Sequence, residues 1–188
     1  MQFRFLLVLI FVAFVPRLFA QLPEIDKSPL DISYAPNLYP ILKFQGKQPV
    51  GTPLARVIYS RPQKNGRQLF GAEIKYNELW RLGANESTEI EFFKSVNIGG
   101  NNISKGRYTM YCIPQAERWT LIFSKDTHTC GAYSFNQASV VARVPVPVIR
   151  PSGLQVEYFT MYFDEKNHLN ILWDNVKVIV PMQFSTGK

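Results

Sequence analysis

The sequence predicts an all-β domain, an antiparallel β-sandwich or jelly roll of about 8–10 strands, with a closed barrel as the alternative. Apolar and polar residues alternate with a period of two in short runs, which is the pattern of half-buried strands. Glycine, asparagine and proline mark turns between these runs. No long helical pattern separates the runs, and parallel strands would need such crossovers, so the strands are expected to pair antiparallel.

The first strands are indicated by alternation at Ala55–Tyr59 and Thr88–Phe92. Val96–Ile113 predicts a hairpin that turns at its Gly-Gly-Asn-Asn stretch, because these residues accept the positive φ of a tight turn. A second hairpin is expected from Arg107–Ile113 to Trp119–Ser124. The first half of the domain therefore consists of short, consecutive antiparallel strands.

Four further β-branched or aromatic runs complete the chain, at Val140–Ile149, Val156–Phe163, Leu169–Trp173 and Val176–Val180. Pro145 and Pro147 lack the N–H donor that a ladder needs, so their strand is predicted at a sheet edge. One helical turn is predicted, at Tyr76–Trp80.

The chain divides into three segments. Residues 1–20 have the parts of a secretory signal peptide: Arg4, an unbroken apolar run at Phe5–Val15, and Ala20 before the expected cut. That run is too short to cross a bilayer, and no later apolar stretch of the sequence is long enough to do so. Residues 21–50 form a proline-punctuated lead-in expected to lie extended against the domain, and residues 51–188 form the β-sandwich domain. The protein is therefore expected to be exported, either to the periplasm or out of the cell.

The charge is mildly positive. Without Arg4 and Arg17 the mature chain has 19 basic and 14 acidic side chains, a net charge of +5. These charges are scattered rather than clustered, so nucleic-acid binding is not predicted. A mild positive charge is compatible with anionic glycans or lipid headgroups nearby, and equally with an ordinary solvated surface.

The sequence contains two cysteines, Cys112 and Cys130. In an oxidising compartment an even pair indicates one disulfide. The alternative is two small buried side chains in neighbouring strands, because bonding requires Cα atoms within about 7 Å and spacing alone does not give that distance.

Candidate ligand-binding residues lie in two polar stretches at predicted strand ends, Ser60–Arg67 and Trp80–Thr88. Arg61 and Arg81 have planar forks that suit a carboxylate, sulfate or phosphate, while Asn85 and Glu86 suit sugar hydroxyls. The structural alternative is that Arg81 and Glu86 pair with each other and Asn85 satisfies turn backbone groups.

Aromatic side chains are the second set of candidates. Trp119 and Tyr133, together with Trp80 and Trp173, would stack on sugar rings if they were exposed. Their alternative role is in the core, since each buries a large apolar area.

No metal site, cofactor or catalytic residue is predicted. His128 and His168 lack partners at ligand-like spacing, and the sequence contains no G-x-S-x-G elbow. Glu86 and several other carboxylates are candidates for a hydrolytic pair, but the sequence does not place any two of them face to face.

Several stretches together resemble a known family. They are ARVIYSRPQKNGRQLFG from Ala55, LWRLGANESTEIEFF from Leu79, KGRYTMYCIP ending at Pro114, WTLIFSKD from Trp119 and GAYSF from Gly131. The chain is similar to the bacterial domain of unknown function 2911 family, whose members are typically exported proteins of the Bacteroidetes group. The resemblance implies an all-β fold and an exported protein, and it implies no reaction or catalytic residue. In that family a Trp usually stands where Cys130 is and a small residue where Cys112 is, which favours the disulfide as a local addition.

Three functions are compatible with these observations. The first is a non-catalytic, exported cell-envelope module that binds a glycan or other polar ligand through the polar loops. The second is an envelope scaffold or protein-partner domain that uses edge strands or the lead-in. The third is a hydrolase with an unrecognised carboxylate pair, which ranks behind the others because the usual catalytic signatures are missing.

Overall fold

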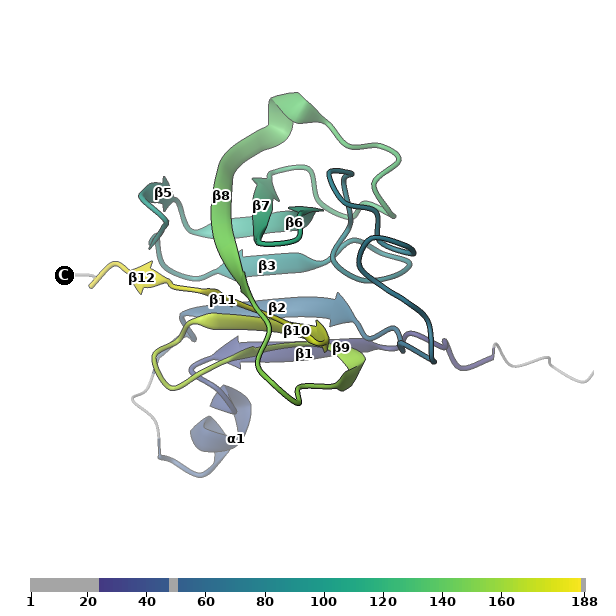
Figure 1. Cartoon of the computed structure of the whole chain (residues 1–188). Helices are drawn as coiled ribbons and strands as arrows, with labels where there is room; N and C mark the ends of the chain where they lie inside the picture. The colour runs from purple at the N-terminus through teal and green to yellow at the C-terminus, as the bar shows by residue number, and fades with distance from the viewer. Residues whose placement is uncertain (1–23, 48–50, 187–188) are drawn as a thin grey trace, which may run out of the picture.

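The structure is a computed structural model that describes residues 24–47 and 51–186 (Figure 1). The predicted signal peptide and its cleavage site lie outside the described residues. Nine strands form one antiparallel sheet in the spatial order β1-β2-β3-β6-β7-β8-β11-β10-β9, and three short strands form a second sheet in the order β12-β4-β5. The antiparallel all-β prediction is confirmed.

The strands of the large sheet are β1 (Leu30–Ala35), β2 (Ala55–Ser60), β3 (Glu89–Phe92), β6 (Gly106–Pro114), β7 (Arg118–Ser124), β8 (Val140–Ile149), β9 (Val156–Phe163), β10 (Leu169–Asp174) and β11 (Val176–Val180). The small sheet contains β4 (Val96–Ile98), β5 (Asn101–Ile103) and β12 (Gln183–Phe184). The helical elements are α1 (Tyr39–Phe44) and the 3₁₀ turn η1 (Gln137–Ser139). Both predicted hairpins, β4–β5 and β6–β7, are confirmed.

The large sheet curls until its two ends meet. The segment that follows β2 continues beside β9: the Phe159 N–H donates to the Pro62 carbonyl at 3.0 Å, and the Lys64 N–H donates to the Glu157 carbonyl at 2.7 Å. An antiparallel bridge joins Gln63 to Tyr158 between them. We call residues 61–64 with β9 the seam. The sheet is thus a nearly closed barrel, a shape close to both the sandwich and the barrel that the sequence predicts.

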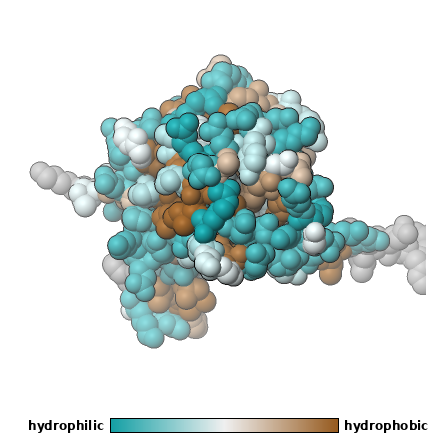
Figure 2. All heavy atoms as spheres, in the orientation of Figure 1, coloured by the Kyte–Doolittle hydropathy of each residue, from teal (hydrophilic) through white to brown (hydrophobic). Residues whose placement is uncertain are grey.

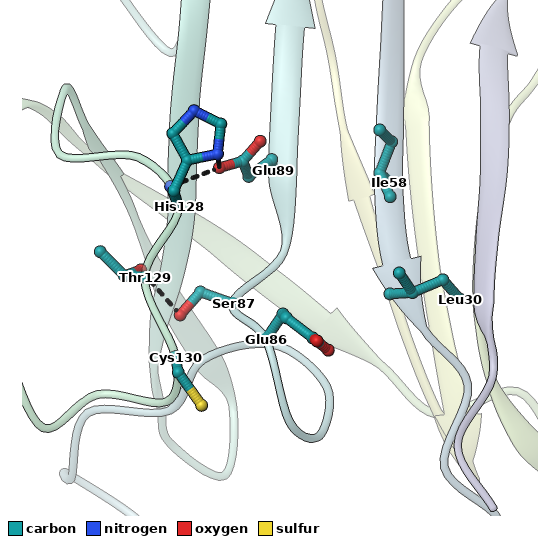
Figure 3. A pocket seen from close by; sticks show the side chains of 8 residues that line it. All are labelled: Leu30, Ile58, Glu86, Ser87, Glu89, His128, Thr129 and Cys130. Atoms are coloured by element: carbon teal, nitrogen blue, oxygen red, sulfur yellow. Dashed lines mark hydrogen bonds and ion pairs between the residues drawn. The ribbon is translucent and has the colours of Figure 1, made fainter. Parts of the chain in front are cut away.

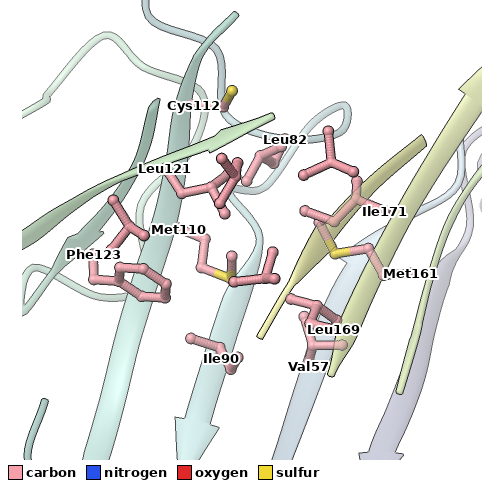
Figure 4. Packing of buried hydrophobic residues seen from close by; sticks show 14 of the residues in the cluster. Val57, Leu82, Ile90, Met110, Cys112, Leu121, Phe123, Met161, Leu169 and Ile171 are labelled. Carbon is pink, nitrogen blue, oxygen red and sulfur yellow. The ribbon is translucent and has the colours of Figure 1, made fainter. Parts of the chain in front are cut away.

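The core fills the barrel because alternate residues of each strand point inward. Val57 in β2, Ile90 in β3, Met110 in β6 and Leu121 in β7 are fully buried and pack against Ile171 from β10, as Figure 4 shows. Burying one such side chain contributes about 1.5–3 kcal/mol relative to leaving it exposed. The period-two pattern of the sequence is therefore the pattern of this core.

Two local predictions are wrong. The strand with Pro145 and Pro147 is β8, which lies between β7 and β11 rather than at an edge. It tolerates the prolines because β11 pairs only with Val148 and Ile149, so the proline positions are laddered on one side. The predicted helical turn ending at Trp80 is absent, since the Trp80 backbone instead forms a bridge with Cys112.

The lead-in is more regular than predicted. Leu30–Ala35 is strand β1, which pairs with β2 along its whole length and so belongs to the barrel. After Pro36 the chain forms α1, with Pro40 in its first turn, a position where the missing N–H of proline costs nothing. The elements between these prolines are therefore short, but proline spacing did not show that one of them, β1, forms part of the large sheet.

Candidate functional site

Arg61 lies in the seam, where each of its three guanidinium nitrogens has a partner. Nη1 pairs with Asp31 Oδ2 at 3.0 Å, Nη2 donates to Thr160 Oγ1 at 3.1 Å, and Nε donates to the Phe159 carbonyl at 3.4 Å. Its guanidinium also lies 5.8 Å from the centre of the Tyr158 ring. Arg61 therefore joins β1, β2 and β9 through all three of its guanidinium nitrogens.

Tyr59 completes this network from β2. Burial raises the pKa of Tyr59 to about 12, so the phenol stays protonated at neutral pH, and its hydroxyl donates to Asp31 Oδ2 at 3.2 Å. Further along the seam, Lys64 Nζ pairs with Asp174 Oδ1 at 2.5 Å. The first polar stretch of the sequence thus closes the barrel.

The second polar stretch forms a loop across one end of the barrel, between Trp80 and β3. Ser60 holds this loop, because its hydroxyl donates to the Ala84 carbonyl and accepts from the Ala84 N–H, both at 2.7 Å. Gly83 has φ +149°, and a Cβ there would lie 2.6 Å from Ser60 Oγ, so the close approach requires glycine. The loop is therefore pinned by Ser60.

A cavity of about 280 Å³, which we call the mouth pocket, lies under this loop. It is near the ends of β2 and β10 and the start of β7. Its lining residues are Ser28, Pro62, Arg67, Leu69, Glu73, Ile74, Trp80, Arg81, Gly83, Ala84 and Trp173. Trp80 and Trp173 lie stacked, with ring centres 6.2 Å apart and planes at 17°. The pocket thus combines aromatic surface with polar and charged groups.

Arg81 is the polar group of the mouth pocket without a partner. Its Nε is buried and has no hydrogen-bond partner among the described residues, and no ion pair within that part of the chain joins it to Glu86. The expected Arg81–Glu86 pair is therefore wrong. Arg67 is different, because it pairs with Glu73 at 3.3 Å and donates to the Gln63 and Lys64 carbonyls.

Asn85 and Glu86 lie outside the mouth pocket. Asn85 has φ +56° and donates from Nδ2 to Asp26 Oδ2 at 2.7 Å, so it satisfies turn geometry and ties the lead-in to the loop. Glu86 is exposed and forms a backbone bridge with Cys130. The four polar candidates of the sequence are therefore separated into the seam, the mouth pocket and the surface beyond it.

Glu86 lines a second cavity, the lateral pocket, of about 310 Å³ on the outer side of β1–β3 (Figure 3). Its lining residues are Leu30, Ile58, Glu86, Ser87, Glu89, His128, Thr129 and Cys130. The Glu89 carboxylate accepts from the His128 N–H at 2.7 Å, and Thr129 Oγ1 donates to Ser87 Oγ at 3.0 Å. In the described ranges no three His, Cys, Asp or Glu side chains gather as a metal site would require.

The two aromatic candidates have opposite positions. Trp119 is 1% exposed and its ring packs 5.7 Å from the Trp80 ring, so it supports the floor of the mouth pocket from the core and presents no face to a ligand. Tyr133 is 92% exposed and lies beside the Gly131 backbone, where a Cβ would be 2.7 Å from its ring. Tyr133 does not line either pocket.

The predicted disulfide between Cys112 and Cys130 is wrong, since both are free thiols. Cys112 points into the barrel core and is fully buried, whereas Cys130 is exposed and its thiol contacts the Asn85 carbonyl. Burial raises the pKa of the Cys112 thiol well above its ordinary value, so this thiol stays protonated. The alternative of two small side chains in neighbouring strands holds for Cys112 alone.

Fold and site together define an antiparallel, barrel-like protein with a small polar and aromatic pocket at one end. The chain belongs to the family described as protein of unknown function DUF2911, whose model matches residues 44–182, which confirms the resemblance. No curated protein and no solved structure matches the chain. Among the described residues, no helix has the length and apolar character needed to cross a bilayer.

Proposed function

We propose that this protein is an exported, non-catalytic binding module that holds a small anionic ligand, such as the carboxylate of an acidic sugar, in the mouth pocket. The observation that carries the proposal is the buried, unpartnered Nε of Arg81. A guanidinium is charged at every physiological pH, and an unsatisfied buried donor costs about 1–3 kcal/mol. A ligand oxygen at Arg81 would remove that cost.

The electrostatics of the pocket support an anion. Its charged lining residues are Arg67, Arg81 and Glu73, and the Arg67–Glu73 pair leaves the charge of Arg81 uncompensated. The mature chain, without Arg4 and Arg17, has a net charge of +5, which further favours the approach of anions.

Size and surface indicate a ligand of about one sugar ring. A cavity of about 280 Å³ lies just below the roughly 300–1,000 Å³ of drug-sized ligand sites. The Trp80 and Trp173 surfaces supply apolar area beside the charge, and such a combination of aromatic walls with a few placed polar groups is typical of ligand sites. An acidic monosaccharide, or the end of an acidic glycan, matches both features.

The test is calorimetric titration of residues 21–188 with glucuronate and galacturonate oligosaccharides, with neutral glucose oligosaccharides and sulfate as comparisons. Arg81→Gln should weaken binding of the acidic sugars about tenfold or more, since a charged bidentate contact is lost. Arg118→Gln is the matched control, because Arg118 is exposed and does not line the pocket. Unchanged affinity in Arg81→Gln, or no binding of any acidic sugar, would overturn the proposal.

Export is part of the proposal and has its own test. The full-length chain expressed in its own host should be found in the periplasmic or culture fraction and begin at Gln21 by N-terminal sequencing. Recovery of the intact N-terminus in the cytosol would contradict it.

A further inference from the structure

The short helix α1 projects from the barrel, at the bottom of Figure 1, and is fixed by one of its sides. Tyr39 is 7% exposed. Its ring stacks on Tyr34, with ring centres 6.3 Å apart and planes at 27°, and its hydroxyl donates to the Gly51 carbonyl. Because Tyr39 anchors the helix to the body of the protein, the remaining sides of α1 face outward.

The outward side carries an apolar stripe, which we define as Leu38, Ile41 and Phe44. Their exposed fractions are 55%, 51% and 91%. Ile41 and Phe44 are three residues apart and so lie on one side of α1, and Leu38 is the residue that directly precedes the helix. Figure 2 shows hydrophobic atoms gathered on the projecting lobe where α1 lies. Large apolar side chains clustered outside the body of a protein mark an interaction surface.

The charges around the apolar stripe indicate the kind of partner that it contacts. Lys43 and Lys47 lie beside the stripe, and residues 36–47 contain no Asp or Glu. Apolar residues flanked by lysine are the pattern of segments that insert shallowly into an anionic bilayer surface. A symmetric contact with a second copy would bring the lysines of both copies together, and the net charge of +5 of residues 21–188 adds to that repulsion.

We propose that α1 docks the protein on the surface of an anionic lipid bilayer, with the stripe among the acyl chains and Lys43 and Lys47 at the headgroups. This surface is separate from the mouth pocket, so α1 attaches the domain to the bilayer while the pocket remains open to ligand. Neither proposal depends on the other.

The test is co-sedimentation of residues 21–188 with vesicles of phosphatidylcholine mixed with phosphatidylglycerol, and with vesicles of phosphatidylcholine alone. The protein should bind the mixed vesicles more tightly, and added salt should weaken that binding. Phe44→Glu should reduce binding to mixed vesicles about tenfold or more, because it removes a large apolar contact. Lys43→Gln with Lys47→Gln should remove the preference for phosphatidylglycerol.

Tyr133→Glu is the matched control, since Tyr133 is an equally exposed aromatic residue outside α1 and its change should leave binding unaltered. Circular dichroism checks that each variant is folded. The proposal is overturned if the wild-type chain does not sediment with mixed vesicles, or if Phe44→Glu binds them as well as the wild type does. It is also overturned if, without lipid, the chain forms a dimer that Phe44→Glu dissociates.

Discussion

Arg61 and Arg81 stand at corresponding ends of two polar stretches, yet the structure uses them differently. Each guanidinium nitrogen of Arg61 donates to a partner in β1 or β9, whereas Arg81 has a buried Nε without a partner among the described residues. Native structures satisfy most of their buried polar groups, so an arginine that is left unsatisfied in a cavity is the stronger candidate for ligand binding. Residue type alone therefore does not distinguish a structural arginine from a ligand-binding arginine. The distinction depends on whether the buried N–H donors have hydrogen-bond partners.

The largest expected effect concerns Trp119, which packs against Trp80 beneath the mouth pocket. Trp119→Ala should lower the free energy of unfolding by about 3–5 kcal/mol, because it opens a cavity in the core. Urea denaturation measures this loss, and Tyr133→Ala, which removes an exposed ring, should change stability by less than about 0.5 kcal/mol. Equal effects of the two changes would show that Trp119 is not the core residue described above.

The second prediction separates the arginines directly. Arg61→Ala should cost about 1–3 kcal/mol of unfolding free energy, since it removes the ion pair with Asp31 and the hydrogen bonds to Thr160 and the Phe159 carbonyl. Arg81→Ala should not lower stability and should raise it, because it removes a buried donor without a partner and loses no described hydrogen bond. Denaturation of both variants in parallel is the measurement, and a larger loss for Arg81 than for Arg61 would reverse the assignment.

A smaller effect concerns Asp164, in the turn between β9 and β10. Burial alone would raise its pKa, but hydrogen bonds from the His168 N–H, the Asn170 amide and the Lys166 N–H outweigh burial and hold the pKa below its ordinary value. The lowered pKa stabilises the folded protein above about pH 4, the ordinary pKa of aspartate, and this contribution disappears as the pH falls through the folded-state pKa.

Thermal unfolding from neutral to acidic pH tests this linkage. The melting temperature of Asp164→Asn should fall less steeply below about pH 4 than that of the wild type, although the variant is less stable at neutral pH. Parallel curves for the two proteins would show that Asp164 does not contribute to acid sensitivity.

The smallest expected effect is that of reducing agent. Because Cys112 and Cys130 are free, reduction should leave the melting temperature unchanged. A thiol reagent should label one cysteine, the exposed Cys130, in the folded chain and both after unfolding. No labelled site in either the folded or the unfolded chain would restore the disulfide.

The sequence predicted most of the fold because strand patterning is local. Alternating apolar residues such as Val57 and Ile90 indicate which face of a strand is buried, and glycine and asparagine indicate turns. It did not predict that Leu30–Ala35 joins the barrel or that β8 is internal, since both depend on which strands pair at long range. Pro145 is tolerated inside the sheet through incomplete pairing, which no local pattern shows.

The site was predicted in part. Polar stretches at strand ends drew attention to Arg61 and Arg81 equally, because sequence does not show which donors find partners. The contribution of Ser28, Arg67 and Glu73 to the mouth pocket was missed, since the sequence does not show that the segment before β1 and the loop after β2 meet at one end of the barrel. The disulfide was predicted from the cysteine count and the family resemblance, and neither shows that Cys112 is buried while Cys130 is exposed.

The central claim is that Arg81 Nε is the free donor of the mouth pocket, and nuclear magnetic resonance of the arginine Nε–Hε groups tests it most directly. On titration of residues 21–188 with galacturonate oligosaccharide, the Arg81 resonance should shift and saturate while the Arg61 resonance, already engaged in the seam, stays in place. Binding that leaves Arg81 unmoved, or that moves Arg61 instead, would contradict the account.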